Sequence, residues 1–382
     1  MTRHGEPTLL TPGPAGTSRR VRNALLRGDL CHREPEFTEL LDRLRAALPA
    51  CLNLAGTHEA VIVTGSGTAA MEMAVIGSVR AGRALLVIRN GMYGDRFVRI
   101  AAAYGIETVV VDGSWTRPAD PHAVADALRG NPRVDAVACV HHETTTGLLN
   151  PVGAIGGIVR DQEAVFIVDA ISSSAIEAPD LPAVAGDVIC GTANKGLHGI
   201  PGVSFVLFSL AKGVERVSAV PRRSLYLDPS ALLAGQRSGS VPFTPAIQAC
   251  YALDEAIAEY VEAGGYTYRV REYSKRAELV RAGFTRNGLS ILVDEPYRAN
   301  SVTALWLPHE VSYGALHDEL KRRGYVVYAG LGPVPDTHFR IATMGDIRPG
   351  ELAGLEAAVR DSLDAIKRHG GVVPPGRRVA RA

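Results

Sequence analysis

The chain has 382 residues, of which 46% are hydrophobic and 21% are charged, and its formal net charge is +1. This length suits two lobes better than one core, and the lack of a long acidic or basic segment excludes a disordered chain or a typical nucleic-acid-binding protein. The five cysteines are scattered without a CxxC pair, and no apolar run is long enough to cross a membrane. We therefore expect reduced thiols, a cytoplasmic protein, and no nucleic acid or membrane as partner.

Short apolar runs alternate with helical patterns between residues 60 and 210. Strands are predicted at EAVIV, RALLVI, ETVVV, VDAVACV, VFIV and DVIC, and a helix is predicted directly after the first of them. These strands are continuously apolar rather than alternating, which is typical of a parallel sheet covered on both faces. Helical crossovers between them predict an α/β fold with a large, doubly wound, mostly parallel sheet.

The pattern changes after residue 245. One long helix is expected from about residue 245 to about residue 285, followed by SILVDEPYRANSVTALWLP, LHDELKRRGYVVYAG and HFRIATMG, which predict a small α+β domain. We expect a large domain at residues 21–245 and a small C-terminal domain at residues 246–367. The Pro- and Gly-containing end, residues 368–382, lacks periodicity and is expected to be a disordered tail.

In such sheets ligands bind beyond the carboxyl ends of the strands. The run EAVIV ends in TGSGT, residues 64–68, and a helix follows at once. Glycines let backbone N–H groups approach an anion, the helix N-terminus carries partial positive charge, and Ser66 and Thr68 add hydroxyl donors. This turn suits a phosphate, although an ordinary glycine-rich turn before a helix has the same composition.

Two further strands end in polar residues. VDAVACV is followed by HHETTTG, whose hydroxyls around Thr144 suit a ligand oxygen or a simple turn. His141 and His142 lack a second ligand set at suitable spacing, so we expect no metal. VFIV ends in Asp169, which is costly to bury unless a cation such as a protonated ring nitrogen pairs with it; a turn or helix-capping aspartate is the alternative.

Lys195 follows the strand DVIC, whereas the other four lysines lie in patterns typical of surface helices or loops. Its amine either reaches solvent or an acid, or it is desolvated, has a lowered pKa and forms a Schiff base. A phosphate cradle, hydroxyls, an acid and a lysine at the ends of strands of one sheet are the four groups that pyridoxal 5'-phosphate requires. We expect this cofactor.

The order of these motifs resembles the class V aminotransferase group of fold-type I pyridoxal-phosphate enzymes over nearly the whole chain. The resemblance is carried by LLTPGPAGTS, NGMYGDR, HHETTTGLLNP, IVDAISS and ANKGLHGIPGVSFV. Within the group, RRSLYLD, PFTP, GYVVYAG, FRIATMGDI and Asn194 before the lysine are most similar to the 2-aminoethylphosphonate–pyruvate transaminase branch.

The resemblance implies an aminotransferase that moves an amino group from 2-aminoethylphosphonate, or a related small amine or amino acid, to pyruvate or another 2-oxo acid. It implies a homodimer with shared active sites and an N-terminal segment, residues 1–20, on the substrate side. The implied catalytic residues are Lys195, which forms the Schiff base and transfers the proton, and Asp169. The implied cofactor-binding residues are Ser66, Gly67, Thr68, Tyr93, Thr144, Asp169, Asn194, Lys195 and Thr244, the last of which reaches the phosphate of the neighbouring subunit. The implied substrate-binding residues are Pro12, Gly13, Arg33 and Arg340.

One segment departs from this branch. CHREPEF, residues 31–37, resembles the serine and alanine transaminases instead. Two alternatives therefore stay open: a serine/alanine–glyoxylate type of transaminase, and an enzyme that uses the same cofactor for lyase or carbon–carbon bond-forming chemistry on an amino acid. A non-enzymatic binding protein is the least favoured hypothesis because Lys195 and Asp169 are both present.

Overall fold

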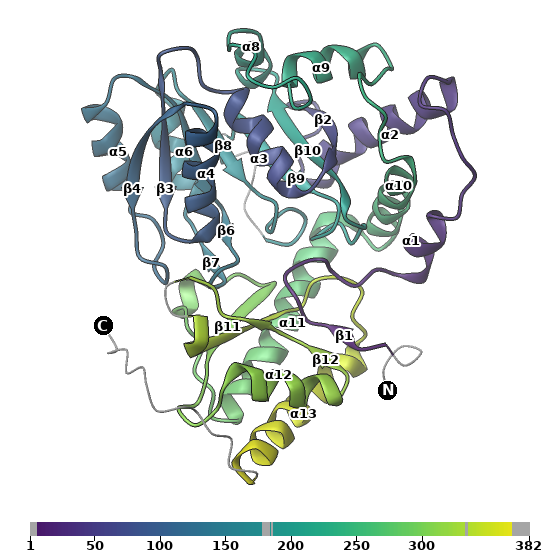
Figure 1. Ribbon diagram of the computed structural model, residues 1–382, viewed down its shortest axis with the longest axis vertical. Helices are drawn as coiled ribbons and strands as arrows, with labels where there is room; N and C mark the ends of the chain where they lie inside the picture. Colours follow the sequence, from purple (N-terminus) through teal and green to yellow (C-terminus); the bar gives the residue numbers. More distant parts are fainter. Residues whose placement is uncertain (1–5, 178–183, 185, 333–334, 369–382) are drawn as a thin grey trace.

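The structure is a computed structural model that describes residues 6–177, 184, 186–332 and 335–368. Residues 369–382, which make up nearly all of the predicted tail, lie outside the described residues. Figure 1 shows a broad upper part that contains the large sheet and a narrower lower part that contains α12 and α13, with the purple N-terminal segment running along the junction of the two.

The upper part is built on one seven-stranded sheet with the strand order β2-β10-β9-β8-β5-β3-β4. Its strands are β2 (His58–Gly65), β3 (Ala84–Arg89), β4 (Glu107–Asp112), β5 (Val134–Val140), β8 (Val165–Asp169), β9 (Val188–Thr192) and β10 (Gly202–Ser209). The pairs from β4 to β9 are all parallel, whereas β10 is antiparallel to both β2 and β9. The predicted α/β fold with a mostly parallel sheet is confirmed.

Successive side chains of each strand point to opposite sides of the sheet, so both faces carry apolar side chains and both are covered by helices. One hydrophobic cluster joins alternate strand residues to helices α2, α6 and α10, and a second joins the intervening residues to α3, α4 and α9. All seven residues of β5 are buried, as the continuous apolar pattern predicts. The helices around the sheet are α1 (Arg19–Ala24), α2 (Pro35–Cys51), α3 (Gly67–Ile76), α4 (Met92–Ala103), α5 (Pro121–Gly130), α6 (Val152–Arg160), α8 (Gly213–Ser218), α9 (Pro229–Arg237) and α10 (Ile247–Glu262).

The lower part contains a three-stranded antiparallel sheet with the order β11-β14-β13, and β1 pairs with β12 beside it. Its elements are β1 (Thr8–Leu9), α11 (Gly265–Arg286), η1 (Glu295–Tyr297), β11 (Val302–Trp306), α12 (Tyr313–Arg322), β12 (Tyr325–Val326), β13 (Tyr328–Ala329), η2 (Pro335–Thr337), β14 (His338–Ala342) and α13 (Pro349–Arg368). A two-stranded hairpin, β6 (His142–Glu143) with β7 (Leu148–Leu149), extends from the large sheet.

The single long helix expected at residues 245–285 is wrong, because two helices occupy this region. The break lies at Gly264 and Gly265, which have φ angles of 105° and 63° and so leave the right-handed helical region. The first helix, α10, packs against α1 and α2 and belongs to a hydrophobic cluster of the large sheet. The predicted domain boundary near residue 245 stays a prediction, and the packing of α10 favours one nearer to residue 264.

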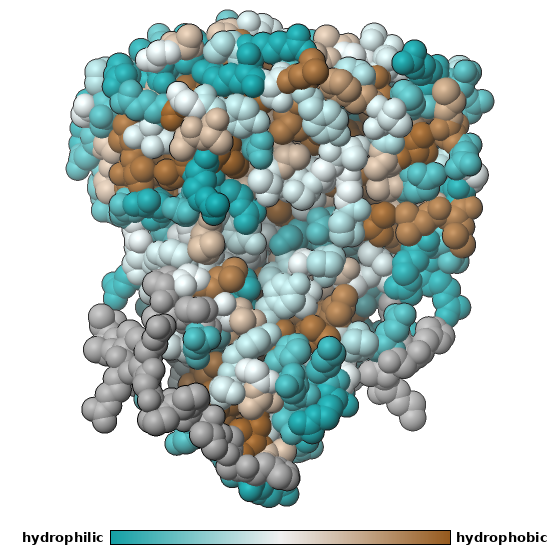
Figure 2. All heavy atoms as spheres, in the orientation of Figure 1, coloured by the Kyte–Doolittle hydropathy of each residue, from teal (hydrophilic) through white to brown (hydrophobic). Residues whose placement is uncertain are grey.

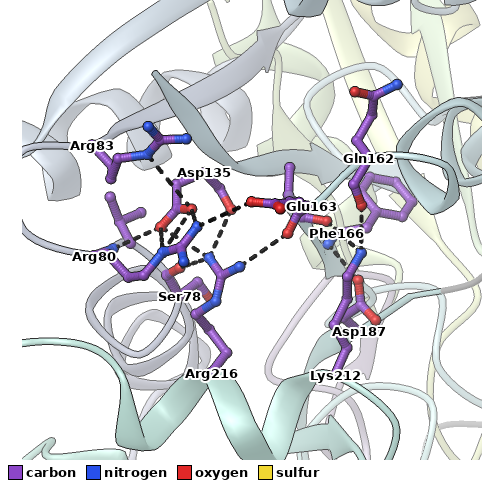
Figure 3. A network of polar contacts seen from close by, with 12 residues as sticks. Ser78, Arg80, Arg83, Asp135, Gln162, Glu163, Phe166, Asp187, Lys212 and Arg216 are labelled. Carbon is purple, nitrogen blue, oxygen red and sulfur yellow. Dashed lines mark hydrogen bonds and ion pairs between the residues drawn. The ribbon is translucent and has the colours of Figure 1, made fainter. Parts of the chain in front are cut away.

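A buried polar network ties together the strand ends opposite to the predicted site. Asp135, near the start of β5, is 1% exposed and is surrounded by three guanidinium groups, as Figure 3 shows. Arg80 donates to it from its backbone N–H and its side chain, Arg216 pairs with it at 2.9 Å, and Arg83 lies 3.8 Å away. The three guanidinium groups offset the cost of burying this carboxylate, and their contacts fix the loop after α3 to the start of β5.

The surface facing the viewer in Figure 2 mixes hydrophilic and hydrophobic side chains, and the hydrophobic ones form several separate patches. Exposed large hydrophobic residues include Leu26, Leu225 and Val261. Among the described residues, no helix combines the length and the apolar character needed to span a membrane.

Candidate active site

Lys195 lies in the polar turn between β9 and β10, three residues beyond the end of β9. Its Nζ donates a hydrogen bond to the backbone carbonyl of Pro12. Gly13 is so close that a Cβ there would lie 2.7 Å from Lys195 Cε. The N-terminal segment thus covers this amine, and the structure brings together the three predicted residues Pro12, Gly13 and Lys195.

Asp169 is the last residue of β8 and lies opposite Cys190 of the neighbouring β9. Its Oδ1 accepts a hydrogen bond of 2.9 Å from the backbone N–H of Ile171, while no donor among the described residues reaches its other oxygen. Burial raises the pKa of the Asp169 carboxyl to about 7, with a smaller push from the charge of Glu143. Burial also lowers the pKa of the Lys195 amine to about 8, although the charge of Asp169 opposes this shift. An amine that loses its proton near neutral pH is suited to act as a nucleophile and a base.

The predicted phosphate cradle is the N-terminus of α3. Ser66 is the N-cap residue, but its side chain makes no capping hydrogen bond. The backbone N–H groups of Gly67 and Thr68 belong to the first turn and have no acceptor among the described residues. A Cβ at Gly67 would lie 2.9 Å from the side chain of Ile171, so the cradle lies close to Asp169. Free N–H groups at a helix N-terminus are suited to bind a phosphate.

Arg340 and Thr144 join the two parts of the molecule at the site. Arg340, in β14, is 3% exposed; its Nη1 donates to the backbone carbonyl of Thr144 at 3.0 Å and its Nε to that of Ala329 at 2.9 Å. The Thr144 hydroxyl is fully buried and finds no hydrogen-bond partner in the part of the chain that the structure describes. Burial lowers the pKa of Arg340. The Thr144 hydroxyl and the Arg340 guanidinium are both buried, and neither has an acidic partner among the described residues. Such groups are suited to bind a polar ligand.

Tyr93 lies in the first turn of α4, and two residues that sequence reasoning missed hold this turn. Glu143 is 0% exposed and its Oε2 accepts from the backbone N–H of Tyr93 at 3.1 Å and of Gly94 at 3.3 Å. Arg96 stacks on the ring of Tyr93 with 4.6 Å between its Cζ and the ring centre, and its Nη1 donates to the Thr68 hydroxyl at 3.1 Å. Both residues occur inside motifs that the sequence analysis quotes, Glu143 in HHETTTG and Arg96 in NGMYGDR.

The remaining predicted residues, Asn194, Thr244 and Arg33, have no recorded contact with the side chain of Lys195 in the part of the chain that the structure describes. Asn194 supports the lysine turn: its Oδ1 accepts from Thr192 Oγ1 at 2.9 Å and its backbone oxygen from Ala15 N–H at 3.3 Å. Thr244 and Arg33 are exposed, and no contact recorded among the described residues joins either to Lys195. Within one chain the structure therefore does not bring these two residues into the site.

Comparison with known proteins agrees with this geometry. The family model for aminotransferase class-V matches residues 19–348. A 2-aminoethylphosphonate–pyruvate transaminase of Syntrophobacter fumaroxidans is 34% identical over 93% of this chain and 96% of its own length. A second such transaminase, of Burkholderia lata, is 32% identical over 96% of this chain and 97% of its own length.

Solved structures agree as well. A pyridoxamine–pyruvate aminotransferase of Mesorhizobium loti is 26% identical, with a TM-score of 0.87 over 96% of this chain and 95% of that one. An alanine–glyoxylate aminotransferase of a Nostoc species is also 26% identical, with a TM-score of 0.87 over 94% of this chain and 95% of that one.

The chain belongs to the class V aminotransferase family. It is a transaminase that depends on pyridoxal 5'-phosphate, as its sequence predicts. The residues present fit this cofactor: the hydroxyl of Thr144, the second oxygen of Asp169 and the N–H groups of Gly67 and Thr68 offer polar contacts that no other described residue uses.

Proposed function

We propose that this enzyme transfers the amino group of 2-aminoethylphosphonate to pyruvate, forming alanine and phosphonoacetaldehyde. The observation that carries the proposal is the identity of 34% and 32% to transaminases of this name over nearly the whole chain. The charges agree with it, because the positive charges of Arg96 and Arg340 both help to lower the pKa of Lys195, and each substrate carries an anionic group.

We propose the following roles for the residues of the chain. Bound pyridoxal 5'-phosphate supplies an electron-withdrawing ring that makes the carbon next to the donor's amino group acidic. Lys195 Nζ would hold the cofactor at its aldehyde carbon, and as a free amine it would take the proton from the donor carbon. The Pro12 carbonyl accepts a hydrogen bond from this amine and so fixes its direction. Asp169 keeps a proton on the ring nitrogen by its negative charge.

The other predicted contacts complete the proposed site. Ser66, Gly67 and Thr68 hold the phosphate, Tyr93 stacks on the ring, Thr144 donates to the ring's phenolic oxygen, and Asn194 orients the lysine turn. The Nη2 of Arg340 has no acceptor among the described residues, and with Nη1 it presents the planar edge that a carboxylate binds at two points. Gly13 gives the donor room beside Lys195, and Arg33 is a second anion contact.

We propose a homodimer in the cytoplasm. The exposed Thr244 serves the phosphate of the neighbouring subunit, which explains why no contact joins it to Lys195 among the described residues of its own chain. The five cysteines are all free, in keeping with a reducing compartment. Sedimentation should give twice the mass of the chain, and Thr244→Ala should weaken cofactor binding without changing this mass. A monomer that turns over at the full rate would contradict the dimer.

The test of the donor uses the purified, cofactor-loaded enzyme with pyruvate and one amine at a time. We expect alanine to form rapidly with 2-aminoethylphosphonate and slowly with serine. The control is Lys195→Ala, which should form none. Alanine from serine alone, or glycine from alanine and glyoxylate alone, would contradict the proposed donor and favour the serine/alanine–glyoxylate type.

The second candidate function is a serine/alanine–glyoxylate transaminase, which the alanine–glyoxylate structure and the segment CHREPEF favour. The exposed Arg33 and the half-buried His32 of this segment are the residues to exchange. If the segment decides the donor, changing it should alter the ratio of kcat/KM for 2-aminoethylphosphonate and serine. Lyase or carbon–carbon bond-forming chemistry would instead consume an amino acid without any 2-oxo acid.

A further inference from the structure

Arg96 connects the two places where the cofactor is expected to be held. It lies in α4, one turn after the N-terminus of that helix, and its Nη1 donates to Thr68 Oγ1 at 3.1 Å. Its Cζ lies 4.6 Å from the centre of the Tyr93 ring. The guanidinium thus bridges the cradle at the N-terminus of α3 and the side chain proposed to stack on the cofactor ring.

This guanidinium is half-buried and lacks an acidic partner. Among the described residues, no carboxylate oxygen lies within the ion-pair distance of Arg96, whereas the nearby Arg89 pairs with Asp112 at 2.6 Å and with Asp95 at 3.7 Å. The direct contacts of Arg96 among the described residues are a hydroxyl and an aromatic ring, neither of which carries a charge, and its own charge acts on Asp169 and Lys195 from further away. A half-buried cation without a direct ion-pair partner among the described residues favours the binding of an anion.

We propose that Arg96 is a ligand of the cofactor phosphate and supplies the positive charge that the cradle otherwise lacks. The backbone N–H groups of Gly67 and Thr68 and the Thr68 hydroxyl give direction, but none of them carries a full charge. The proximity of Arg96 to Thr68 places its fork on the phosphate side, and stacking on Tyr93 limits its rotation. This inference rests on the proposed position of the phosphate at residues 66–68, and it does not depend on the amino donor.

The test compares binding of pyridoxal 5'-phosphate and of pyridoxal, which has a hydroxyl where the cofactor has its phosphate. Apo protein is titrated with each compound, and the bound fraction is followed by absorbance. The variants are Arg96→Gln and Arg96→Lys. The matched control is Arg99→Gln, which removes the same charge three residues further along α4 from an exposed side chain.

We expect Arg96→Gln to weaken binding of pyridoxal 5'-phosphate by about ten- to a hundredfold, the range for losing a charge-assisted hydrogen bond. Binding of pyridoxal should change by less than about threefold, since it carries no phosphate for the guanidinium to meet. Arg96→Lys should recover part of the loss, and Arg99→Gln should match the wild type. Inorganic phosphate should also compete less well with the cofactor in Arg96→Gln.

Three outcomes would overturn the inference. Equal weakening of both compounds would mean that Arg96 acts on the ring through Tyr93. Unchanged binding of both, with a raised KM for 2-aminoethylphosphonate only, would mean that Arg96 meets the anion of the donor. Unchanged binding of both with unchanged KM would mean that it meets neither. Failure of the wild type to bind pyridoxal 5'-phosphate would instead contradict the cofactor site itself, so the two failures are distinguishable.

Discussion

The amine of Lys195 donates a hydrogen bond to the carbonyl of Pro12, 183 positions earlier in the chain. The next residue, Gly13, makes this approach possible: a Cβ there would lie 2.7 Å from Lys195 Cε and 2.9 Å from Nζ, and its φ of 135° is unfavourable for other residues. The N-terminal segment therefore fits over the reactive amine only with glycine at this position.

Gly13→Ala should lower kcat by about a hundredfold, the loss typical of a displacement of about 1 Å at a reacting group. The matched control is Gly157→Ala in α6, where an added Cβ meets nothing within 4 Å and alanine should stabilise the helix slightly. Steady-state turnover and thermal unfolding of both variants check this. A Gly13→Ala enzyme with full activity would show that the amine does not need this contact.

The titration of Lys195 in the apo protein is a second prediction. Because burial lowers its pKa to about 8, the amine should react with an acylating reagent with a midpoint near pH 8. Labelling at each lysine is measured by mass spectrometry over pH 6 to 11, with the exposed Lys321 as internal reference. In Asp169→Asn the midpoint should move to lower pH, since the negative charge of Asp169 raises the pKa of Lys195. A midpoint above that of Lys321 would contradict the buried position of the amine.

Asp169→Asn should separate stability from activity. The folded-state pKa of Asp169, about 7, lies above its ordinary value of 3.8, so the folded apo protein keeps a proton that the unfolded chain loses between these two pH values. The free energy of unfolding that this group contributes is full below the lower value, decreases as pH rises to 7 and then levels off. At pH 8 the apo variant should therefore unfold at a higher temperature than the wild type, and the two should agree at low pH.

The same variant should lose turnover by about a hundredfold or more, as is typical when one preorganised electrostatic group is removed. Thermal unfolding of the apo proteins at pH 4 and pH 8 and turnover of the loaded proteins check both parts. A less stable apo variant at pH 8 would mean that the Ile171 N–H bond to Asp169 outweighs the cost of burying the charge.

How far the sequence predicts this molecule can be seen at particular residues. The continuous apolar runs of β5 and β8 predict a covered parallel sheet, and the two strands do end side by side, with Asp169 opposite Val140. The apolar pattern of a strand depends only on neighbouring residues, so it can be read directly from the sequence. The contact of Pro12 with Lys195 depends on tertiary folding and has no local pattern.

The errors have physical reasons as well. Residues 245–285 are helical throughout their pattern, and only the two adjacent glycines, Gly264 and Gly265, reveal the break. Arg96 is one of many arginines, and its significance comes from the absence of an acidic neighbour, which no sequence pattern reports. A carboxylate at a strand end is typically solvent-exposed, so the sequence does not predict that Glu143 is buried. Its carboxylate oxygens accept four hydrogen bonds, from Tyr93, Gly94 and Thr145.

Arg340→Lys should raise the KM for pyruvate by about ten- to a hundredfold and change kcat less, because lysine keeps the charge but loses the planar fork. Arg340→Gln should raise the KM for pyruvate further, because it also loses the charge. The control is Arg360→Gln in α13, whose side chain is 57% exposed and pairs with the adjacent Asp361. Thermal unfolding must accompany the kinetics, since Arg340 also donates to the carbonyls of Thr144 and Ala329. An unchanged KM for every 2-oxo acid would contradict the proposed carboxylate contact.

The network around Asp135 should stabilise the fold without affecting the chemistry. Burial disfavours the ionised Asp135, but hydrogen bonds from Arg80 and the charge of Arg216 outweigh it and lower its pKa. Asp135→Asn leaves three guanidinium groups without their carboxylate and should lower the free energy of unfolding at pH 7 by about 3 kcal/mol. In the wild type this contribution should be present above pH 3.8, the ordinary pKa of an aspartate, and be lost as pH falls through the lower folded-state pKa.

The matched control for Asp135→Asn is Asp126→Asn, which removes the same charge from an exposed pair with Arg129 on α5. Exposed pairs contribute little, so this control should change the free energy of unfolding by less than about 0.5 kcal/mol. Denaturant unfolding of the apo proteins and kcat of the loaded ones are the two measurements. Asp135 lies at the start of β5, and the site lies beyond the other end of that strand, so kcat should stay within about twofold of the wild type at temperatures where the variant is folded. A large fall in kcat of the folded variant would show that this network and the active site are coupled through the sheet.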